Sequence, residues 1–476
     1  MQKINEVLKN VFGHQDFHGV QKEVINRALQ GDSSLVIMPT GFGKSLCYQL
    51  PSEILPGLTL VISPLIALMK DQVDGALKKG LKASFINSSL KPEERKLRYK
   101  KLAKGEYNLL YVTPERFKKE EFRSAVSQNQ VSLLAIDEAH CISEWGHDFR
   151  PDYTRIKEFV EFLNGPPVMA LTATATTDVQ KDIIQQIGKE DIKSLVYGIE
   201  RPNLFVQVES VYGDHEKIQH IVSLLHKHAG TTIIYFSLIS TLEKFSQMLS
   251  QLNIEHLQYH GRLSDKLRKK NQDQFVKGEC PLILATPAFG LGVDKSNVRQ
   301  VIHVEVPGSV EAYYQEIGRA GRDGKSAYCT LLFDSDDISI QMDFVKWANP
   351  DPEFIRSLFQ LIRKNQEKVK SLGLEFLREK MNFYNSRDFR LETALNLLER
   401  WDCISFNQKK YPEIIGEIPE DFLEEGLYTK RLKKQNEKLF DMLQYTKLEE
   451  CRKQYIYKYF GIDHEPCGFC DNCEEG

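Results

Sequence analysis

The sequence has no long hydrophobic run, no internal repeat and no low-complexity tract. None of its apolar stretches reaches the ~20 residues that a membrane-spanning helix needs, which excludes a helix that crosses a bilayer. Residues 1–10 are typical of the start of an amphipathic helix, and no apolar stretch follows them, which argues against a secretory signal. We therefore expect a cytoplasmic protein without a membrane partner.

Net charge is also nearly absent, because 63 basic side chains face 66 acidic ones and leave −3. A chain whose whole surface attracts nucleic acid is excluded, so any such surface must be local. A length of 476 residues is too great for one core and predicts about three domains. Five of the nine cysteines are scattered, and we expect them to be reduced and buried.

Short apolar runs alternate with amphipathic helical segments over the first two thirds of the chain. This pattern predicts parallel sheets covered by helices on both faces. The runs fall into two sets, 35–38, 58–63, 109–112, 133–136 and 168–171, and then 231–236, 282–285, 301–304 and 328–333. We predict two α/β domains, 1–203 and 204–343, with a boundary near Arg201-Pro202-Asn203.

Strand patterns almost stop after residue 343. Three helices are predicted at 353–364, 374–381 and 389–401, followed by two short strands at 403–406 and 413–418. Three helices and a two-stranded wing would make a winged-helix-like insert at about 350–420, and a helical spacer is the alternative. Residues 421–476 are predicted to be a helical module that ends in clustered cysteines.

A glycine-rich loop separates the first apolar run from a helix, because residues 39–45 read Pro-Thr-Gly-Phe-Gly-Lys-Ser. Such a loop and the following helix N-terminus direct N–H groups at phosphate oxygens. We expect Thr40, Gly41 and Gly43 to hold phosphates, Lys44 to neutralise their charge and Ser45 to ligate Mg²⁺. A generic glycine turn is the alternative, and the strand, loop and helix in sequence disfavour it.

Asp137 and Glu138 directly follow the run 133–136. They should therefore lie at the carboxyl end of a parallel strand, where α/β sheets bind ligands. We expect Asp137 to hold Mg²⁺, and Glu138 to orient and deprotonate an attacking water. Alone, an acidic pair at a strand end is often a solvated turn, but here a phosphate loop precedes it at a distance that one domain allows.

A third motif, in the second α/β domain, runs from Gln315 to Arg322. Arg319 and Arg322 are three residues apart on a predicted helix and would share one face. Two guanidiniums on one face can clamp a γ-phosphate across a cleft, and such an arginine is worth roughly 10³ to 10⁵ in rate. A charged surface face is the alternative, but the glycines at 318 and 321 favour close backbone approach.

The stretch after the acidic pair carries Trp145, His147, Phe149 and Arg150. Aromatic rings of this kind can stack on unpaired bases, at roughly 1–3 kcal/mol per base, and arginine pairs with phosphate. Trp145 and Phe149 as core aromatics are the alternative. Hydroxyl and arginine side chains that follow strands of the same domain suit sequence-independent phosphate contacts. These are Ser63, Thr113 and Arg116.

Four cysteines cluster near the end of the chain. Cys467, Cys470 and Cys473 have the spacing C-x2-C-x2-C, and Cys451 stands sixteen residues before them on a predicted helix at 449–460. Four thiolates suit tetrahedral Zn²⁺ and leave no open position, so we expect a structural zinc site. Disulfides are the alternative, which a cytosolic compartment disfavours.

Taken together, these motifs resemble those of RecQ-family DNA helicases of helicase superfamily two. The resemblance covers about residues 4–343 and the cysteine module, and it includes an N-terminal segment that reads adenine in this family. By resemblance, Gln21 bonds the adenine edge and Phe17 lies beside the ring. The matching segments are 12–21, 38–51, 63–66, 70–72, 113–116, 137–150, 172–174, 285–299 and 315–322.

The resemblance implies two RecA-like domains that use ATP, Mg²⁺ and Zn²⁺ and move 3′ to 5′ on single-stranded DNA. It implies unwinding of forked or junction duplex in DNA repair and recombination. A single-strand-binding protein is a candidate partner, and we expect a monomer.

The chain departs from the family pattern at His18, Ile239 and Pro287, where Arg, Arg and Val are usual. The winged-helix-like insert is expected before the zinc module rather than after it, and no terminal helicase-and-RNase-D-type domain is expected. Tyr411 is then the candidate side chain for splitting a duplex. The alternatives are an RNA helicase of the DEAD-box class and a non-unwinding scaffold that binds DNA junctions.

Overall fold

The computed structural model describes residues 2–39, 41–64, 66–143, 153, 155–290, 295–382, 388–406 and 411–474. Within these ranges every helix is too short or too polar to cross a membrane. The chain divides into two compact units. The first unit comprises Met1–Glu305, Glu311–Phe333 and Leu448–Gly476, and the second comprises Val306–Val310 and Asp334–Lys447.

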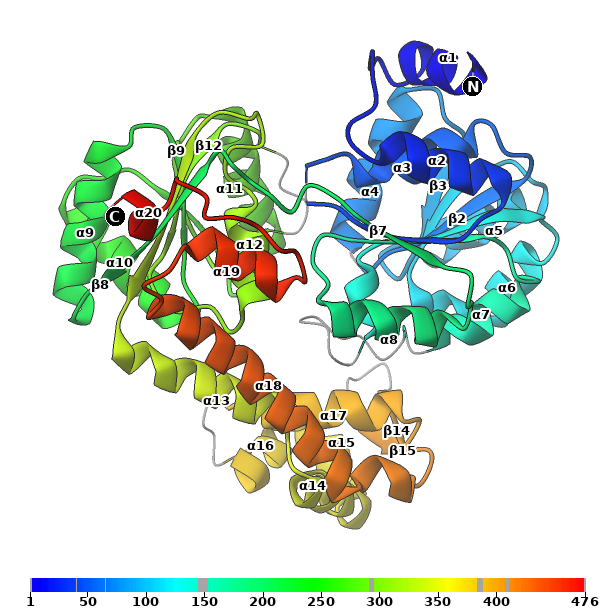
Figure 1. Ribbon diagram of the computed structural model, residues 1–476. Coiled ribbons are helices and arrows are strands. Elements are labelled where there is room, and N and C mark those ends of the chain that lie inside the picture. The colour runs from blue at the N-terminus through cyan, green and yellow to red at the C-terminus, as the bar shows by residue number, and fades with distance from the viewer. Residues whose placement is uncertain are drawn as a thin grey trace. The chain divides into compact units, whose positions relative to one another are not determined.

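A seven-stranded parallel sheet forms the first half of the first unit, with the order β3-β4-β2-β5-β6-β1-β7 (Figure 1). Its strands are β1 Ser34–Ile37, β2 Leu58–Ile62, β3 Ala83–Ile86, β4 Leu109–Val112, β5 Val131–Ile136, β6 Val168–Thr172 and β7 Lys193–Val196. The five predicted strands are confirmed, and β3 and β7 were not predicted. Both lie at sheet edges, where fewer side chains are buried and no apolar run is needed.

Helices cover both faces of this sheet. Val36 and Leu35 point to opposite faces, and both are fully buried, as are Leu60 and Val61 of β2 and residues 133–136 of β5. One face packs against the first four helices in a single apolar cluster. The helices of this domain are α1 Gln2–Asn10, α2 Gln21–Gln30, α3 Lys44–Ser52, α4 Ile66–Lys78, α5 Pro92–Ala103, α6 Glu120–Val126, α7 Ile156–Phe162 and α8 Thr177–Ile187.

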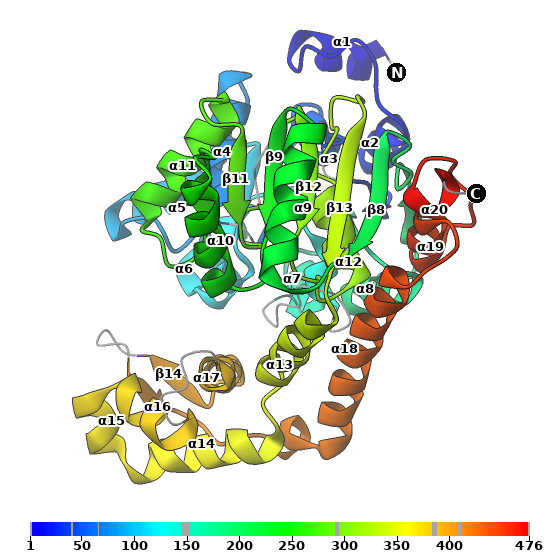
Figure 2. The ribbon, with the colours of Figure 1, turned by 90° about the vertical axis from the view of Figure 1, so that its left-hand side faces the viewer.

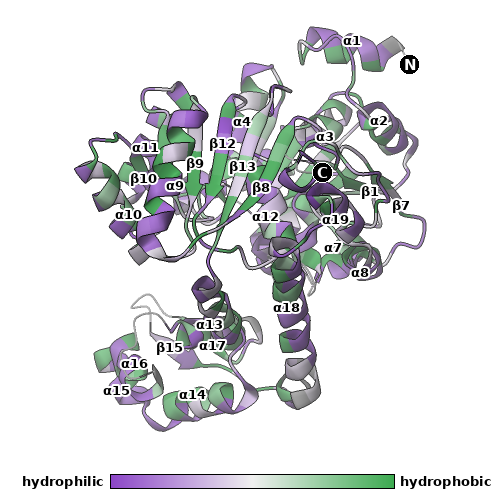
Figure 3. Ribbon diagram, turned by 60° about the vertical axis from the view of Figure 1, so that its left-hand side comes forward, coloured by the Kyte–Doolittle hydropathy of each residue, from purple (hydrophilic) through white to green (hydrophobic). Residues whose placement is uncertain are grey.

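A six-stranded parallel sheet with the order β10-β11-β9-β12-β13-β8 forms the second half of the unit (Figure 2). The four predicted strands are confirmed, and the two missed ones, β8 and β10, are again at the edges. The elements are β8 Leu204–Ser210, α9 Gly213–Lys227, β9 Thr231–Tyr235, α10 Ile239–Gln251, β10 Leu257–Tyr259, α11 Asp265–Lys277, β11 Leu282–Ala285, β12 Val298–His303, α12 Val310–Ile317 and β13 Ala327–Phe333. Figure 3 shows the apolar character of the strands β9, β13 and β8.

The second unit is mostly helical. It contains α13 Ile338–Ala348, α14 Pro352–Lys364, α15 Gln366–Leu372, α16 Leu374–Asn382, α17 Arg390–Arg400, β14 Ile404–Phe406, β15 Pro412–Ile414 and α18 Glu425–Thr446. The three predicted helices and the antiparallel strand pair are present, with α15 in addition and a second strand shorter than predicted. Tyr411 is partly buried and packs against the core that these elements share.

The last segment, from Leu448 onward, returns to the first unit. It holds α19 Arg452–Tyr459 and the short α20 Asp471–Glu474. Both lie beside β8, and Figure 2 shows them next to this edge strand. The isolated bridge between Val206 and Cys470 extends the contact with the sheet. The predicted 421–476 segment is therefore divided between the two units.

Candidate nucleotide site and zinc centre

The phosphate loop lies between the end of β1 and the start of α3 at Lys44. Gly41 and Gly43 have φ angles of 89° and 76°, a conformation that glycine adopts without the penalty of a side chain. The loop thereby turns into the N-terminus of α3, the end that attracts anions. Lys44 folds back over the loop, and its Nζ donates to Met38 O at 3.4 Å. Ser45 is partly buried in the first turn of α3. Thr40 lies outside the described residues.

Gln21 connects the N-terminal segment to this loop. It is the first residue of α2 and is buried, and its Oε1 accepts from His18 N at 2.8 Å. Its Nε2 donates to Phe42 O at 2.9 Å. The predicted adenine-reading glutamine therefore contacts the phosphate loop directly, while Phe17 packs against the apolar cluster of the first sheet. Contact of either residue with adenine stays a prediction.

The two carboxylates follow β5 as predicted. Asp137 N donates to Ile62 O at 2.8 Å, and Glu138 N donates to Asp137 Oδ1 at 3.1 Å. Burial, together with the neighbouring Glu138 charge, raises the pKa of Asp137 to about 7, although Lys44 opposes the shift. Glu138 has a φ of 50°, a strained conformation that turns its side chain into a buried position. Because the two negative charges repel each other, the site favours binding of a proton or a cation between Asp137 and Glu138.

A path of polar contacts leads from Glu138 to the end of β6. His140 lies in the short helix Ala139–Ile142, and its Nδ1 is 3.3 Å from Glu138 Oε2 and 2.9 Å from Thr172 Oγ1. Thr172 Oγ1 in turn accepts from Thr174 N at 3.3 Å. Sequence reasoning assigned no role to these three residues. Their positions could have indicated them, since Thr172 ends a buried parallel strand and His140 and Thr174 follow such strands at the same sheet edge.

The prediction that Arg319 and Arg322 share a helix face was wrong. The helix α12, on which the partly buried Gln315 lies, ends at Ile317, and both arginines follow it. Gly321 has a φ of 57°, which an α-helix cannot accommodate. Arg319 is buried and its Nη1 donates to Gly290 O, within its own domain.

Arg322 lies at the phosphate loop instead. A Cβ built on Gly41 would be 2.9 Å from Arg322 Cδ, so only glycine leaves room for this arginine. Of the two arginines, the structure thus brings Arg322 to the nucleotide site. The clamping role predicted for Arg319 stays a prediction.

The residues predicted to contact nucleic acid are only partly described. Ser63 and Thr113 directly follow the neighbouring strands β2 and β4, and Ser63 N donates to Val112 O at 3.0 Å. Arg116 lies in the 3-10 helix Pro114–Lys118, and all three side chains are buried. Trp145, His147, Phe149 and Arg150 lie outside the described residues.

The four clustered cysteines come together as predicted. Their Sγ atoms all lie within 4.8 Å of one another, near the ~3.8 Å separation that Zn–S bonds of ~2.3 Å require in a tetrahedron. Cys451 caps α19 and accepts from Gln454 N at 3.4 Å and Cys467 N at 3.2 Å. Although burial opposes it, these N–H donors lower the pKa of Cys451 to about 7, whereas burial raises the pKa values of Cys467 and Cys470. All nine cysteines are free thiols.

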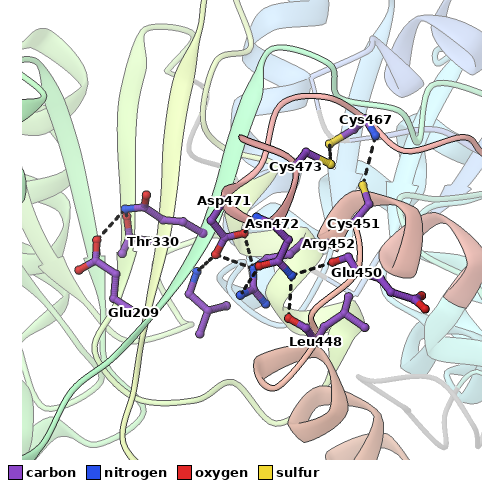
Figure 4. A network of polar contacts seen from close by, with 12 residues as sticks. Glu209, Thr330, Leu448, Glu450, Cys451, Arg452, Cys467, Asp471, Asn472 and Cys473 are labelled. Carbon is purple, nitrogen blue, oxygen red and sulfur yellow. Dashed lines mark hydrogen bonds and ion pairs between the residues drawn. The ribbon is translucent and has the colours of Figure 1, made fainter. Parts of the chain in front are cut away.

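Polar contacts attach the cysteine cluster to β8 (Figure 4). Arg452 Nε is 2.6 Å from Asp471 Oδ1, and both groups are largely buried. Asp471 Oδ2 also accepts from Val208 N at 2.9 Å. Asn472 Nδ2 donates to Leu448 O at 2.6 Å, which ties the end of the chain to the start of the segment. A metal held by the four thiolates would therefore fix α19 and α20 against the second sheet.

Three family models match the chain in order along the sequence. They are the DEAD/DEAH box helicase at residues 18–183, the helicase conserved C-terminal domain at 216–324 and the RecQ zinc-binding model at 419–474. Except for Phe17, the predicted nucleotide-site residues fall in the first two models, and the four cysteines fall in the third.

Curated relatives include ATP-dependent DNA helicase RecQ of Haemophilus influenzae, 43% identical over 70% of this chain and 53% of the relative. RecQ of Bacillus subtilis is 37% identical over 88% of this chain and 66% of the relative. The chain thus spans between half and two thirds of these two proteins. The probable ATP-dependent DNA helicase RecS of Bacillus subtilis is 36% identical over 77% of this chain and 74% of the relative.

Solved structures support the fold. The helicase MrfA bound to DNA and AMPPNP aligns with a TM-score of 0.59 at 20% identity, covering 72% of this chain and 52% of that one. Dbp5 of S. cerevisiae bound to RNA and ADP BeF3 aligns with a TM-score of 0.57 at 16% identity, covering 71% and 89%. The family models and the curated relatives, together with the nucleotide site and the cysteine cluster, show that the chain belongs to the RecQ family of ATP-dependent DNA helicases.

Proposed function

We propose that this protein is an ATP-dependent DNA helicase that moves along single-stranded DNA and unwinds duplex during repair and recombination. One observation carries the proposal: Arg322, from the second α/β domain, lies at the phosphate loop of the first. This is the arrangement that nucleotide hydrolysis by two domains requires. The family membership supplies DNA as the polymer. Movement from 3′ to 5′ rests on the resemblance.

At the nucleotide, the proposed role of each residue follows from its charge. Lys44 and Arg322 neutralise the negative charge that develops on the transferred phosphoryl group, and Ser45 and Asp137 would hold Mg²⁺. Mg²⁺, when bound, adds a further positive charge at the phosphates. Glu138 orients the attacking water and takes its proton. His140, whose Nδ1 is 3.3 Å from Glu138 Oε2, holds the Glu138 carboxylate in place. Gln315 and Arg319 are proposed as supporting groups from the second domain.

The DNA strand is proposed to follow the loops at the carboxyl ends of β2, β4 and β5. Ser63, Thr113 and Arg116 would bind phosphates, and the stretch with Trp145, His147, Phe149 and Arg150 would contact bases next to the carboxylates. The chain from Glu138 through His140 to Thr172 offers a physical link between hydrolysis and the strand-end loops. Each hydrolysis cycle would then advance one strand past the two domains.

The remaining assignments are proposed with the same function. The domains are 1–203, 204–343, a winged-helix-like insert at 350–420 and a zinc module at 421–476. Tyr411, beside β15, is the candidate for strand separation, and its partial burial against the core favours a supporting role over an exposed wedge. We propose a monomer that works in the cytoplasm, with a single-strand-binding protein as a partner.

A strand-displacement assay tests the function. The protein should release a labelled strand from a forked DNA duplex only with ATP and Mg²⁺, and Lys44→Ala should abolish both release and DNA-stimulated ATP hydrolysis. Arg27→Gln, a substitution of a partly buried arginine outside the nucleotide site, is the control and should leave both rates unchanged. Greater stimulation of ATP hydrolysis by RNA than by DNA, or hydrolysis that survives Lys44→Ala, would contradict the proposal.

A further inference from the structure

The segment that connects the two sheets contains a buried arginine that the proposed function does not use. Residues 197–203 run from β7 to β8, and Arg201 is only 4% exposed. A buried guanidinium needs hydrogen-bond acceptors. Arg201 Nη1 donates to Gly318 O at 3.2 Å, and Nη2 donates to Ala320 O at 2.6 Å. Both carbonyls belong to the turn that carries Arg319 and leads into Arg322.

Asn203 completes the same interaction. Its Nδ2 donates to Gly321 O at 2.8 Å and to Lys325 O at 2.9 Å. The carbonyls of Gly318, Ala320 and Gly321, three of the four in the turn 318–321, therefore accept from two side chains of the connecting segment. The fit is close, because a Cβ on Gly321 would lie 2.4 Å from Asn203 Nδ2. The connecting segment thus sets the conformation of the turn.

The zinc module holds the connecting segment from the other side. Arg201 N donates to Tyr457 Oη at 3.0 Å, and Lys453 Nζ donates to Arg201 O at 3.4 Å and Pro202 O at 3.3 Å. Lys453 and Tyr457 are one turn apart on α19 and are both buried. Lys453 Nζ is also 5.0 Å from the centroid of the Phe469 ring, within the loop that carries the cysteines.

These contacts form one continuous path from the cysteine cluster to the turn 318–321. We propose that Arg201 is a positioning residue for Arg322: it holds the turn 318–321 in place, and α19 of the zinc module fixes the backbone from which it reaches. The inference rests on the proposed ATP hydrolysis and deepens it. It assigns the zinc module a part in the geometry of the nucleotide site, beyond holding its own segment together.

Arg201→Gln is the first test, because it removes the charge and the forked donor while leaving the backbone contact with Tyr457. We expect kcat for DNA-stimulated ATP hydrolysis to fall roughly 10- to 100-fold, since a displaced arginine no longer meets the transition state. KM for ATP and the zinc content should stay at wild-type values. Arg201→Lys, which keeps the charge and one donor, should recover part of kcat.

The matched control is Arg27→Gln, because Arg27 also donates from Nη2 to a turn carbonyl, Ser33 O at 2.9 Å, but that turn carries no predicted site residue. It should leave kcat unchanged. Tyr457→Phe removes only the acceptor of the Arg201 N–H and should lower kcat by roughly five-fold, the effect of one hydrogen bond. A loss of zinc or a raised KM that accompanies the fall in kcat of Arg201→Gln would overturn the proposal in favour of a general structural role.

A double-mutant cycle separates positioning of Arg322 from an independent effect. If Arg201 acts through Arg322, adding Arg201→Gln to Arg322→Ala should cause no further loss of kcat. Losses that multiply would overturn the proposal.

Hydrogen exchange gives a readout that needs no activity. Amides of residues 318–324 should exchange faster in Arg201→Gln than in the wild type, while those of β9 and β11 should not change. Unchanged exchange in 318–324 would overturn the inference even if the protein hydrolyses ATP. Wild-type protein without ATP hydrolysis would instead overturn the proposed function, so the two failures are distinguishable.

Discussion

At the scale of single residues, the nucleotide site contains an unfavourable electrostatic interaction between two neighbouring carboxylates. Asp137 and Glu138 are adjacent carboxylates, partly buried and buried respectively, and Glu138 adopts a strained backbone conformation. Such arrangements persist because the fold around them determines their positions, and they are common where a cation must bind. Substitution of one carboxylate should therefore stabilise the protein while removing its activity.

Asp137→Asn should raise the Tm of the protein without nucleotide or added Mg²⁺ at pH 8 by roughly 5 °C or more. The folded-state pKa of Asp137 is about 7 against an ordinary value of 3.8. Between these values the folded protein keeps a proton that the unfolded chain has released, so this group lowers stability as pH rises from ~4 to ~7. The increase in Tm caused by Asp137→Asn should therefore vanish near pH 4. Thermal unfolding at both pH values checks this, with the exposed Asp273→Asn as the control. An equal gain at both pH values would exclude the electrostatic origin.

The positions of the site residues were predictable to different extents. Lys44, Asp137 and the four cysteines follow from local motifs whose geometry the backbone dictates over a few residues. The conformation of the turn 318–321 could not be predicted from a local motif, because the preceding helix ends at Ile317. The carbonyls of this turn accept hydrogen bonds from Arg201 and Asn203, which stand more than a hundred residues earlier. No local pattern reports such long-range partners.

At the scale of elements, the edge strand β8 is the point at which the zinc module attaches. Asp471 joins it to Arg452 on α19 and to the backbone of β8, and Cys470 forms a bridge with Val206. Free edges of sheets tend to pair with other chains, and this one is covered by its own chain. The edge strands were also the elements that hydrophobic pattern missed, since an edge needs fewer buried side chains to form.

Asp471→Asn should detach this module. It removes the negative partner of a largely buried ion pair, which costs roughly 3–5 kcal/mol because the charge of Arg452 is left buried without a carboxylate. We expect a lower Tm and faster loss of zinc to a chelator, measured by thermal unfolding and by metal release. The control is Asp463→Asn, an exposed carboxylate of the same segment. Unchanged zinc release in Asp471→Asn would show that the thiolates hold the segment without this contact.

At the scale of the whole molecule, the proposed nucleotide chemistry and the proposed DNA contact use different side chains, so substitution should separate them. Combined Trp145→Ala and Arg150→Ala substitutions should reduce unwinding of forked DNA more than ATP hydrolysis without DNA, because they leave Lys44, Asp137 and Arg322 in place. Strand displacement and phosphate release measured on the same preparation check this. Equal loss of both activities would remove the coupling role of this stretch.

The contact between Arg201 and Tyr457 has a consequence for how the protein is made. The two residues are 256 positions apart, and the later one lies close to the end of the sequence. At ~5–20 residues per second, a ribosome needs roughly 13–50 s to travel from one to the other. For that interval both sheets can form while the Arg201 N–H in the segment between them still lacks its Tyr457 acceptor. Zinc deficiency in the cell would lengthen the interval before α19 docks, and nascent chains of this protein would then be a substrate for chaperones and proteases.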